Sequence, residues 1–115
     1  MDSEKKRERY CLLLDHYGPV LSGRCKDVLE LYYEEDLSLS EIAENCGITR
    51  QGVHDAIRRG EADLLLWEKK LHFAEKSGAI LDLASALKAH ASEPDEVRRL
   101  SDAISDAVLS GAEGD

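Results

Sequence analysis

The strongest constraint on the fold is a set of three residue types at fixed spacing in the stretch EIAENCGITRQGVHDAIRR. Ala43 is small where two crossing helices must approach closely, Gly47 follows four residues later, and Val53 follows after six more. Glycine suits the left-handed backbone of a tight turn, and Val53 would face the first helix. An ordinary helical hairpin would not need this combination, so we interpret the segment as a helix-turn-helix. Its predicted framework consists of Ile42, Ala43, Gly47, Ile48, Val53 and Ile57.

Capping residues and a long apolar seam support this interpretation. Ser38 and Glu41 have the spacing of a capping box, and Thr49 is a suitable N-cap for the following helix. Beyond Thr49, apolar or small residues step alternately by four and three, as in a helix packed like a coiled coil. They are Val53, Ile57, Gly60, Leu64, Trp67, Leu71 and Ala74. The pattern predicts one long helix that continues to about Glu75.

Helical periodicity continues on both sides of this motif. One helix is predicted from about Ser3 to His16, with Gly18-Pro19 ending it, and a second begins at the N-cap Ser22. Their apolar stripes are Tyr10, Leu13, Leu14 and Tyr17, then Cys25, Val28, Leu29 and Tyr32. Two further stripes follow Ser77-Gly78, the second with Pro94 in its first turn. The stripes are Ile80, Ala84, Leu87 and Ala91, then Val97, Leu100, Ile104 and Val108.

No segment alternates with the period of a strand, so the predicted fold class is all-α, with a long recognition helix and additional C-terminal helices. A chain of 115 residues suits a single helical domain over residues 1–115. Within it we expect a helix-turn-helix core with its extended fourth helix at 22–76, C-terminal helices at 77–110 and a tail at 111–115.

The charge of the chain complicates a nucleic-acid function. Fifteen Lys and Arg oppose twenty-four Asp and Glu, and the net charge of -9 would repel a polyanion unless basic groups gather on one face. The acidic excess is greatest toward the C-terminus, whereas the helical middle is close to neutral. The distribution of charge therefore matters more than its total.

Several other classes of protein are disfavoured. Three widely spaced cysteines without a C-x-x-C pair fit reduced thiols in a cytoplasmic protein, and no segment approaches the roughly 20 apolar residues of a membrane span. The histidines lie far apart without ligand neighbours, and neither a phosphate-binding glycine loop nor a nucleophile motif is present. We expect no metal, no cofactor and no catalysis.

Side chains pointing away from the seam are candidates for contact with nucleic acid. They are Thr49, Arg50, Gln51, His54, Arg58 and Arg59. N-terminal side chains of such a helix would reach base edges, while the two later arginines would hold phosphates. Asp55 lies three and four residues before Arg58 and Arg59, so a solvated charge cluster is the alternative. Leu64, Trp67 and Leu71 are predicted core residues that would form a partner or homodimer seam if exposed.

The segments DHYGPVL, VLELYYEEDLSLSEIAENCGITRQGVHDAIRR and EKKLHF resemble the YlxM-like (UPF0122-type) family of bacterial proteins, whose helix-turn-helix is similar to domain 4 of sigma factors. The likeness runs from about Leu12 to Phe73. It implies a non-enzymatic regulatory or adaptor protein of the signal recognition particle pathway, which binds the particle's GTPase, its RNA or both. Gly23 early in the second helix and the weakly basic recognition helix depart from this pattern and weaken the sigma-like reading of DNA.

Two other functions stay open at the level of sequence. A DNA-binding transcriptional regulator would use the same outward side chains on a duplex. A purely protein-binding helical module would use the helix-turn-helix only as a scaffold, because one fold hosts several functions.

Overall fold

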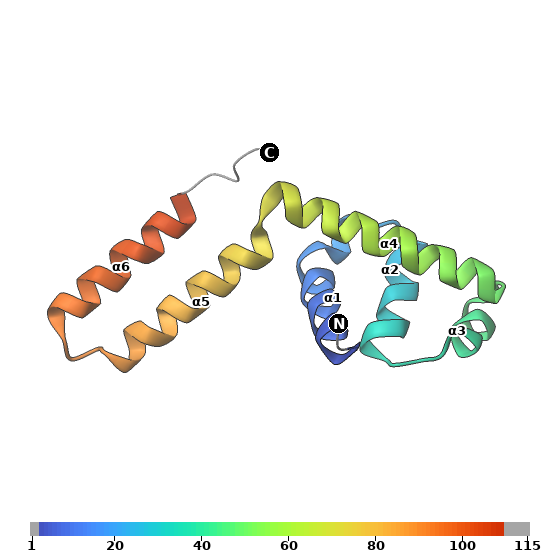
Figure 1. The fold of residues 1–115 in the computed structure, drawn as a ribbon, viewed down its shortest axis with the longest axis horizontal. Helices are drawn as coiled ribbons and strands as arrows, with labels where there is room; N and C mark the ends of the chain where they lie inside the picture. The colour runs from blue at the N-terminus through green and yellow to red at the C-terminus, as the bar shows by residue number, and fades with distance from the viewer. Residues whose placement is uncertain (1–2, 110–115) are drawn as a thin grey trace. The chain divides into compact units, whose positions relative to one another are not determined.

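The computed structural model describes residues 3–109, and every regular element within them is helical (Figure 1). The α-helices are α1 (Ser3–Tyr17), α2 (Gly23–Leu29), α3 (Leu39–Cys46), α4 (Arg50–Leu71), α5 (Phe73–Ala89) and α6 (Pro94–Leu109). A 3-10 turn, η1 (Gly18–Val20), and a π-helical segment, η2 (Glu30–Glu34), complete the order. The predicted all-α fold with additional C-terminal helices is confirmed, and the predicted tail at 111–115 lies outside the described residues.

The chain divides into two compact units, residues 1–69 (unit 1) and residues 70–115 (unit 2). Unit 1 holds the helix-turn-helix, and unit 2 holds the C-terminal helices. A single domain over the whole chain, with subdivisions at 22–76 and 77–110, stays a prediction.

Unit 1 has one apolar core to which α1, α2, α3 and α4 all contribute. Its largest fully buried side chains are Leu13, Cys25, Val28, Leu29, Ile42, Val53 and Leu64. Burying a Leu, Ile or Val side chain contributes about 1.5–3 kcal/mol, so these residues dominate the stability of the unit.

Helix α4 crosses α2 at Gly60, where no side chain would fit. A Cβ atom on Gly60 would lie 2.6 Å from Leu29 Cδ1 and 3.5 Å from Cys25 Cβ. Leu29 is itself fully buried and has little room to move. Glycine costs a helix about 1 kcal/mol relative to alanine, and the close approach of two helices is what offsets that cost here.

Tyrosine hydroxyls connect α1 and η2 to α4. Tyr17 Oη donates a hydrogen bond of 2.5 Å to Glu68 Oε1, and Tyr33 Oη donates to the Glu61 carboxylate. Arg7 Nε donates to the Tyr33 carbonyl oxygen at 2.8 Å, which adds a contact from α1 to η2. Burial, followed by the hydrogen bond to Glu61, raises the pKa of Tyr33 above its ordinary value.

The π-helical turn corrects one prediction. The apolar stripe predicted Tyr32 on the core side of the second helix, but Tyr33 is buried and Tyr32 is only half-buried. In η2 the Glu35 amide donates to the Glu30 carbonyl oxygen at 3.0 Å, five residues back, so the helix turns more slowly than an α-helix. That slower turn brings Tyr33 to the core side, one position later than α-helical spacing predicts.

The end of α4 corrects another prediction. The seam predicted a helix to about Glu75 with Ala74 on it, but α4 ends at Leu71 and Ala74 lies in α5. His72 has a left-handed backbone, φ 57°, which His, Asn and Asp adopt more readily than most residues. The sequence placed the next helical stripe after Ser77-Gly78, whereas α5 already begins at Phe73 and includes both residues. A single glycine costs a helix only about 1 kcal/mol and is tolerated inside α5.

Unit 2 is an antiparallel hairpin of α5 and α6, joined by residues 90–93 (Figure 1). Pro94 occupies the first position of α6 as predicted, where a missing N–H removes no helical bond. The Glu93 carbonyl oxygen accepts the first bond of that helix from the Val97 amide at 2.9 Å. Leu100 of α6 is buried in this hairpin.

The contact at Gly60 predicts opposite effects for two glycine substitutions. Gly60→Ala should lower the free energy of unfolding by about 1–3 kcal/mol, because the new methyl group overlaps Leu29 in a filled core. Gly78→Ala is the matched control: a Cβ there meets nothing within 4 Å, so this variant should gain roughly 0.5–1 kcal/mol from helix propensity. Urea unfolding measures both, and a stabilised Gly60→Ala variant would contradict the close approach.

The Tyr33 hydroxyl predicts an alkaline loss of stability. Because the folded state raises the pKa of Tyr33, its contribution is intact below the unfolded pKa of about 10 and is lost as the pH rises above it. Tyr33→Phe should cost about 1–2 kcal/mol at pH 7, and the gap to the wild type should narrow above about pH 10. Tyr32→Phe, in the neighbouring half-buried residue, is the control. Equal losses in both variants at every pH would argue against a specific role for the Tyr33 hydroxyl.

Candidate nucleic-acid interface

The start of α3 is fixed by a complete capping box. The Glu41 amide donates to Ser38 Oγ at 3.1 Å, and the Ser38 amide donates to Glu41 Oε1 at 2.8 Å. These bonds satisfy backbone groups that a helix otherwise leaves without partners. The predicted cap at Ser38 is confirmed.

The turn between α3 and α4 has the geometry that the sequence predicted. Gly47 has a left-handed backbone, φ 69° and ψ 35°, and the Ile48 amide donates to the Ala43 carbonyl oxygen at 3.0 Å. Thr49 Oγ1 then accepts from the Gly52 amide at 2.9 Å, so Thr49 caps α4. The turn is compact, and it sets α4 against α3.

The framework residues lie where a helix-turn-helix places them. Ile42, Ala43, Val53 and Ile57 are buried, and Ile48 is half-buried. Gly47 occupies the left-handed position of the turn. Because Val53 and Ile57 face the core, the opposite side of α4 faces outward.

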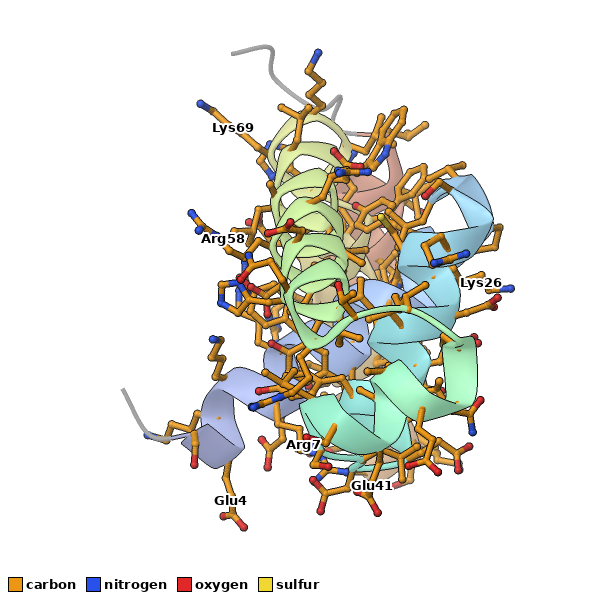
Figure 2. The ribbon with its side chains drawn as sticks, turned by 90° about the vertical axis from the view of Figure 1, so that its right-hand side faces the viewer. Glu4, Arg7, Lys26, Glu41, Arg58 and Lys69 are labelled. Carbon is orange, nitrogen blue, oxygen red and sulfur yellow. The ribbon has the colours of Figure 1, made fainter. Side chains whose placement is uncertain are left out.

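All candidate contact residues are exposed on or beside that outward side. They are Thr49, Arg50, Gln51, His54, Arg58 and Arg59. Figure 2 shows Arg58 and Lys69 projecting from the same side of α4. Lys69 was not among the sequence candidates, but its spacing of eleven residues from Arg58, close to three helical turns, places it on the same face.

Asp55 forms a hydrogen bond with Gln51 and no ion pair with the two arginines. Its Oδ1 accepts a hydrogen bond of 2.9 Å from Gln51 Nε2, one turn earlier. Across residues 3–109, neither Arg58 nor Arg59 forms an ion pair with a carboxylate. The guanidinium groups are therefore available to an external anion, while Gln51 is partly occupied by Asp55.

A shallow hollow of about 290 Å³ lies at the N-terminal end of α4. It is lined by Leu39, Arg50, Gln51 and His54. Donor side chains here add to the positive end of the helix dipole. A base or phosphate could be contacted at this end of α4, while Arg58 and Arg59 lie one to two turns further on.

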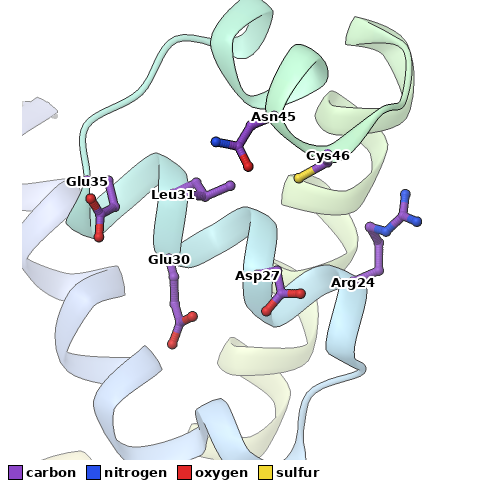
Figure 3. A pocket seen from close by; sticks show the side chains of 7 residues that line it. All are labelled: Arg24, Asp27, Glu30, Leu31, Glu35, Asn45 and Cys46. Atoms are coloured by element: carbon purple, nitrogen blue, oxygen red, sulfur yellow. The ribbon is translucent and has the colours of Figure 1, made fainter.

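The groove on another face of unit 1 has the opposite charge. It measures about 450 Å³, and Figure 3 shows the side chains that line it: Arg24, Asp27, Glu30, Leu31, Glu35, Asn45 and Cys46. Close by, burial and the carboxylates of Asp15 and Glu30 raise the pKa of Glu34. This acidic groove would repel a polyanion. The sequence carried a signal for it, since neither Lys nor Arg occurs between Lys26 and Arg50.

The residues considered as a partner seam differ in exposure. Leu64 is fully buried in the core of unit 1 and so presents no surface to a partner. Trp67 and Leu71 are half-buried. The free cysteines also divide, with Cys25 in the core and Cys11 and Cys46 half-buried.

Two other kinds of site are absent from the part of the chain that the structure describes. Between residues 3 and 109, no cluster of His, Cys, Asp or Glu has the arrangement of a metal site. None of the helices in this range combines the length and apolar character that a membrane crossing needs.

A capped helix, a left-handed glycine turn and a long outward-facing second helix define this chain as a helix-turn-helix protein. Residues 4–104 match the model of the UPF0122 family, described as "Putative helix-turn-helix protein, YlxM / p13 like", and the chain belongs to that family. It is 40% identical to a UPF0122 protein of Desulforamulus reducens over 92 residues, covering 76% of this chain and 79% of that protein. It is 43% identical to a UPF0122 protein of Symbiobacterium thermophilum over 84 residues, covering 73% and 78%.

The turn predicts a strain penalty at Gly47. Gly47→Ala should lower the free energy of unfolding by about 1–2 kcal/mol, because a Cβ disfavours the left-handed backbone whatever the surrounding space. Gly23→Ala, in the first turn of α2, has equally open space around its Cβ and serves as the control, with an expected change below about 0.5 kcal/mol. Thermal unfolding compares them, and equal midpoints would contradict a strained turn.

Proposed function

We propose that this chain is a non-enzymatic regulatory or adaptor protein of the signal recognition particle pathway, acting in the cytoplasm. It binds the particle's RNA, its GTPase or both, and the RNA contact is assigned to the outward face of α4. The resemblance to the YlxM-like family supports the pathway. The single observation that carries the contact is the set of exposed arginines, Arg50, Arg58 and Arg59, on the second helix of the motif.

Phosphate is the chemistry that this face suits. Guanidinium groups hold phosphate oxygens through paired, charge-assisted hydrogen bonds, and Arg58 and Arg59 have no carboxylate partner in the described part of the chain. His54 and Arg50 at the N-terminal end add donors to the hollow of α4. The acidic groove leaves α4 as the favoured side of unit 1 for a polyanion.

A DNA-binding transcriptional regulator is the second candidate, and the turn geometry of α3 and α4 favours it. A recognition helix in the major groove lies between two rows of phosphates. Asp55 would then bring its carboxylate toward those rows, which makes duplex DNA the less favoured partner.

The charges on α4 predict opposite effects of two substitutions on RNA affinity. Arg58→Ala should weaken binding by roughly tenfold and lower the slope of log K against log salt by about 1, because one phosphate contact is lost. Asp55→Asn should strengthen binding severalfold, because it removes a like charge from the same face. Fluorescence anisotropy with the particle's RNA, at several salt concentrations, measures both.

Arg98→Ala is the control for charge, since it removes one exposed arginine from α6 in unit 2 and should leave affinity unchanged. Equal losses for Arg58→Ala and Arg98→Ala would argue for non-specific attraction. Tighter binding to a duplex DNA of similar length would favour the transcriptional regulator.

A pull-down with the tagged chain, with and without nuclease, separates RNA contact from protein contact. The proposal for RNA expects the particle's RNA in the bound fraction and loss of the GTPase after nuclease treatment. A combined Gln51→Ala, His54→Ala and Arg58→Ala variant should lose the RNA as well. Retention of the GTPase by this variant despite nuclease would favour a purely protein-binding module.

A further inference from the structure

Unit 2 has one face that is apolar on both of its helices. Leu81 and Ala84 follow Ile80 on α5 by one and four residues, and Ile104 and Val108 follow Leu100 on α6 by four and eight. Ile80 is half-buried and Leu100 is buried, and both lie where α5 and α6 pack together. Each residue turns about 100° around a helix, so the four later residues all lie to the same side of Ile80 or Leu100. In an antiparallel pair, equal rotation places both strips on one side of the hairpin. We call Leu81, Ala84, Val97, Ile104 and Val108 the apolar face.

The carboxylates of the hairpin lie elsewhere. Helical rotation places the acidic residues of α5 and α6 on the opposite side or across the seam: Glu75, Asp82, Asp95, Glu96, Asp102 and Asp106. Lys88 lies on the same rotational side as the apolar face, one turn after Ala84 and near the C-terminal end of α5. Within α5 and α6, the apolar face therefore carries no acidic side chain although the unit is acidic.

The apolar face is poorly covered. Leu81 is 67% exposed and Val108 is 59% exposed, while Val97 and Ile104 are half-buried. Among the described residues of unit 2, only Ala74 and Leu100 are buried. A hairpin of two helices is too small to enclose a core, and units of about 40 residues commonly need an additional partner to be stable.

We propose that unit 2 is a dimerisation element, and that its apolar face packs against the same face of a second copy of this chain. The charge pattern favours a second copy of the chain as the partner. Each copy carries carboxylates on the other sides of α5 and α6, so two copies avoid placing carboxylates opposite each other only when they meet through the apolar face. A two-fold axis through the face gives a self-complementary contact and an antiparallel four-helix bundle. This surface is distinct from the seam of Leu64, Trp67 and Leu71, and it does not depend on the proposed RNA contact.

Sedimentation equilibrium of the full chain over a wide range of concentrations tests the proposal. The wild type should be a dimer, and Leu81→Glu should raise the dimer dissociation constant by at least about 100-fold, because a two-fold contact carries the change twice. Ala79→Glu is the matched control, since it adds the same charge at an exposed residue of α5 on the other side of the seam. It should leave the dissociation constant within about threefold, well below the loss expected for burial of a new charge.

Val108→Glu provides an independent test from α6 and should weaken the dimer as Leu81→Glu does. Circular dichroism at a protein concentration high enough to keep each variant dimeric should show the helix content of the wild type, because each altered side chain is mostly exposed. A wild type that stays monomeric at every concentration would overturn the proposal. A dimer that is weakened equally by Ala79→Glu and Leu81→Glu, or by neither, would also overturn it.

Discussion

The close crossing of α4 over α2 at Gly60 is the contact on which the arrangement of unit 1 depends. Because Leu29 occupies the space of the missing side chain, the buried side of α4 is fixed in rotation. Glu61, one residue later, then meets Tyr33, and Glu68, two turns later, meets Tyr17. A rotation of α4 would break both hydrogen bonds, so the same contact determines which side chains of α4 face outward.

That rotation places the exposed arginines of α4 on a different side of unit 1 from the acidic groove. Arg50, Arg58 and Arg59 face outward from α4, whereas Asp27, Glu30 and Glu35 line the groove beside α2, η2 and α3. The net charge of -9 is therefore compatible with a basic face, because interactions with a bound anion are dominated by charges within about one Debye length, roughly 8–10 Å in physiological salt. The apparent conflict between an acidic chain and a nucleic-acid motif is one of distribution.

The sequence predicted the features that local chemistry decides. The capping box at Ser38, the cap at Thr49 and the left-handed turn at Gly47 each depend on a few neighbouring residues, and all are present. It missed features that depend on competition between contacts. Periodicity could not separate Tyr32 from Tyr33 because a π-helical turn changes the spacing, and spacing alone could not show that Gln51, and not an arginine, holds Asp55. The outward side chains were found, whereas their functional roles stay predictions.

The acidic residues also restrict where each unit can make contacts. In unit 1 several of them line the groove, while Arg50, Arg58 and Arg59 are exposed on α4 beside Asp55. In unit 2 the carboxylates of α5 and α6 lie off the apolar face. Like charges facing each other across an interface oppose association, so an acidic surface disfavours contact with polyanions and with other copies of the chain. Each unit then retains one face that such a partner can approach. The outward face of α4 and the apolar face of unit 2 are the two exceptions. An acidic chain with these two faces binds its partners more selectively than a neutral chain would, because its acidic surface disfavours contacts elsewhere.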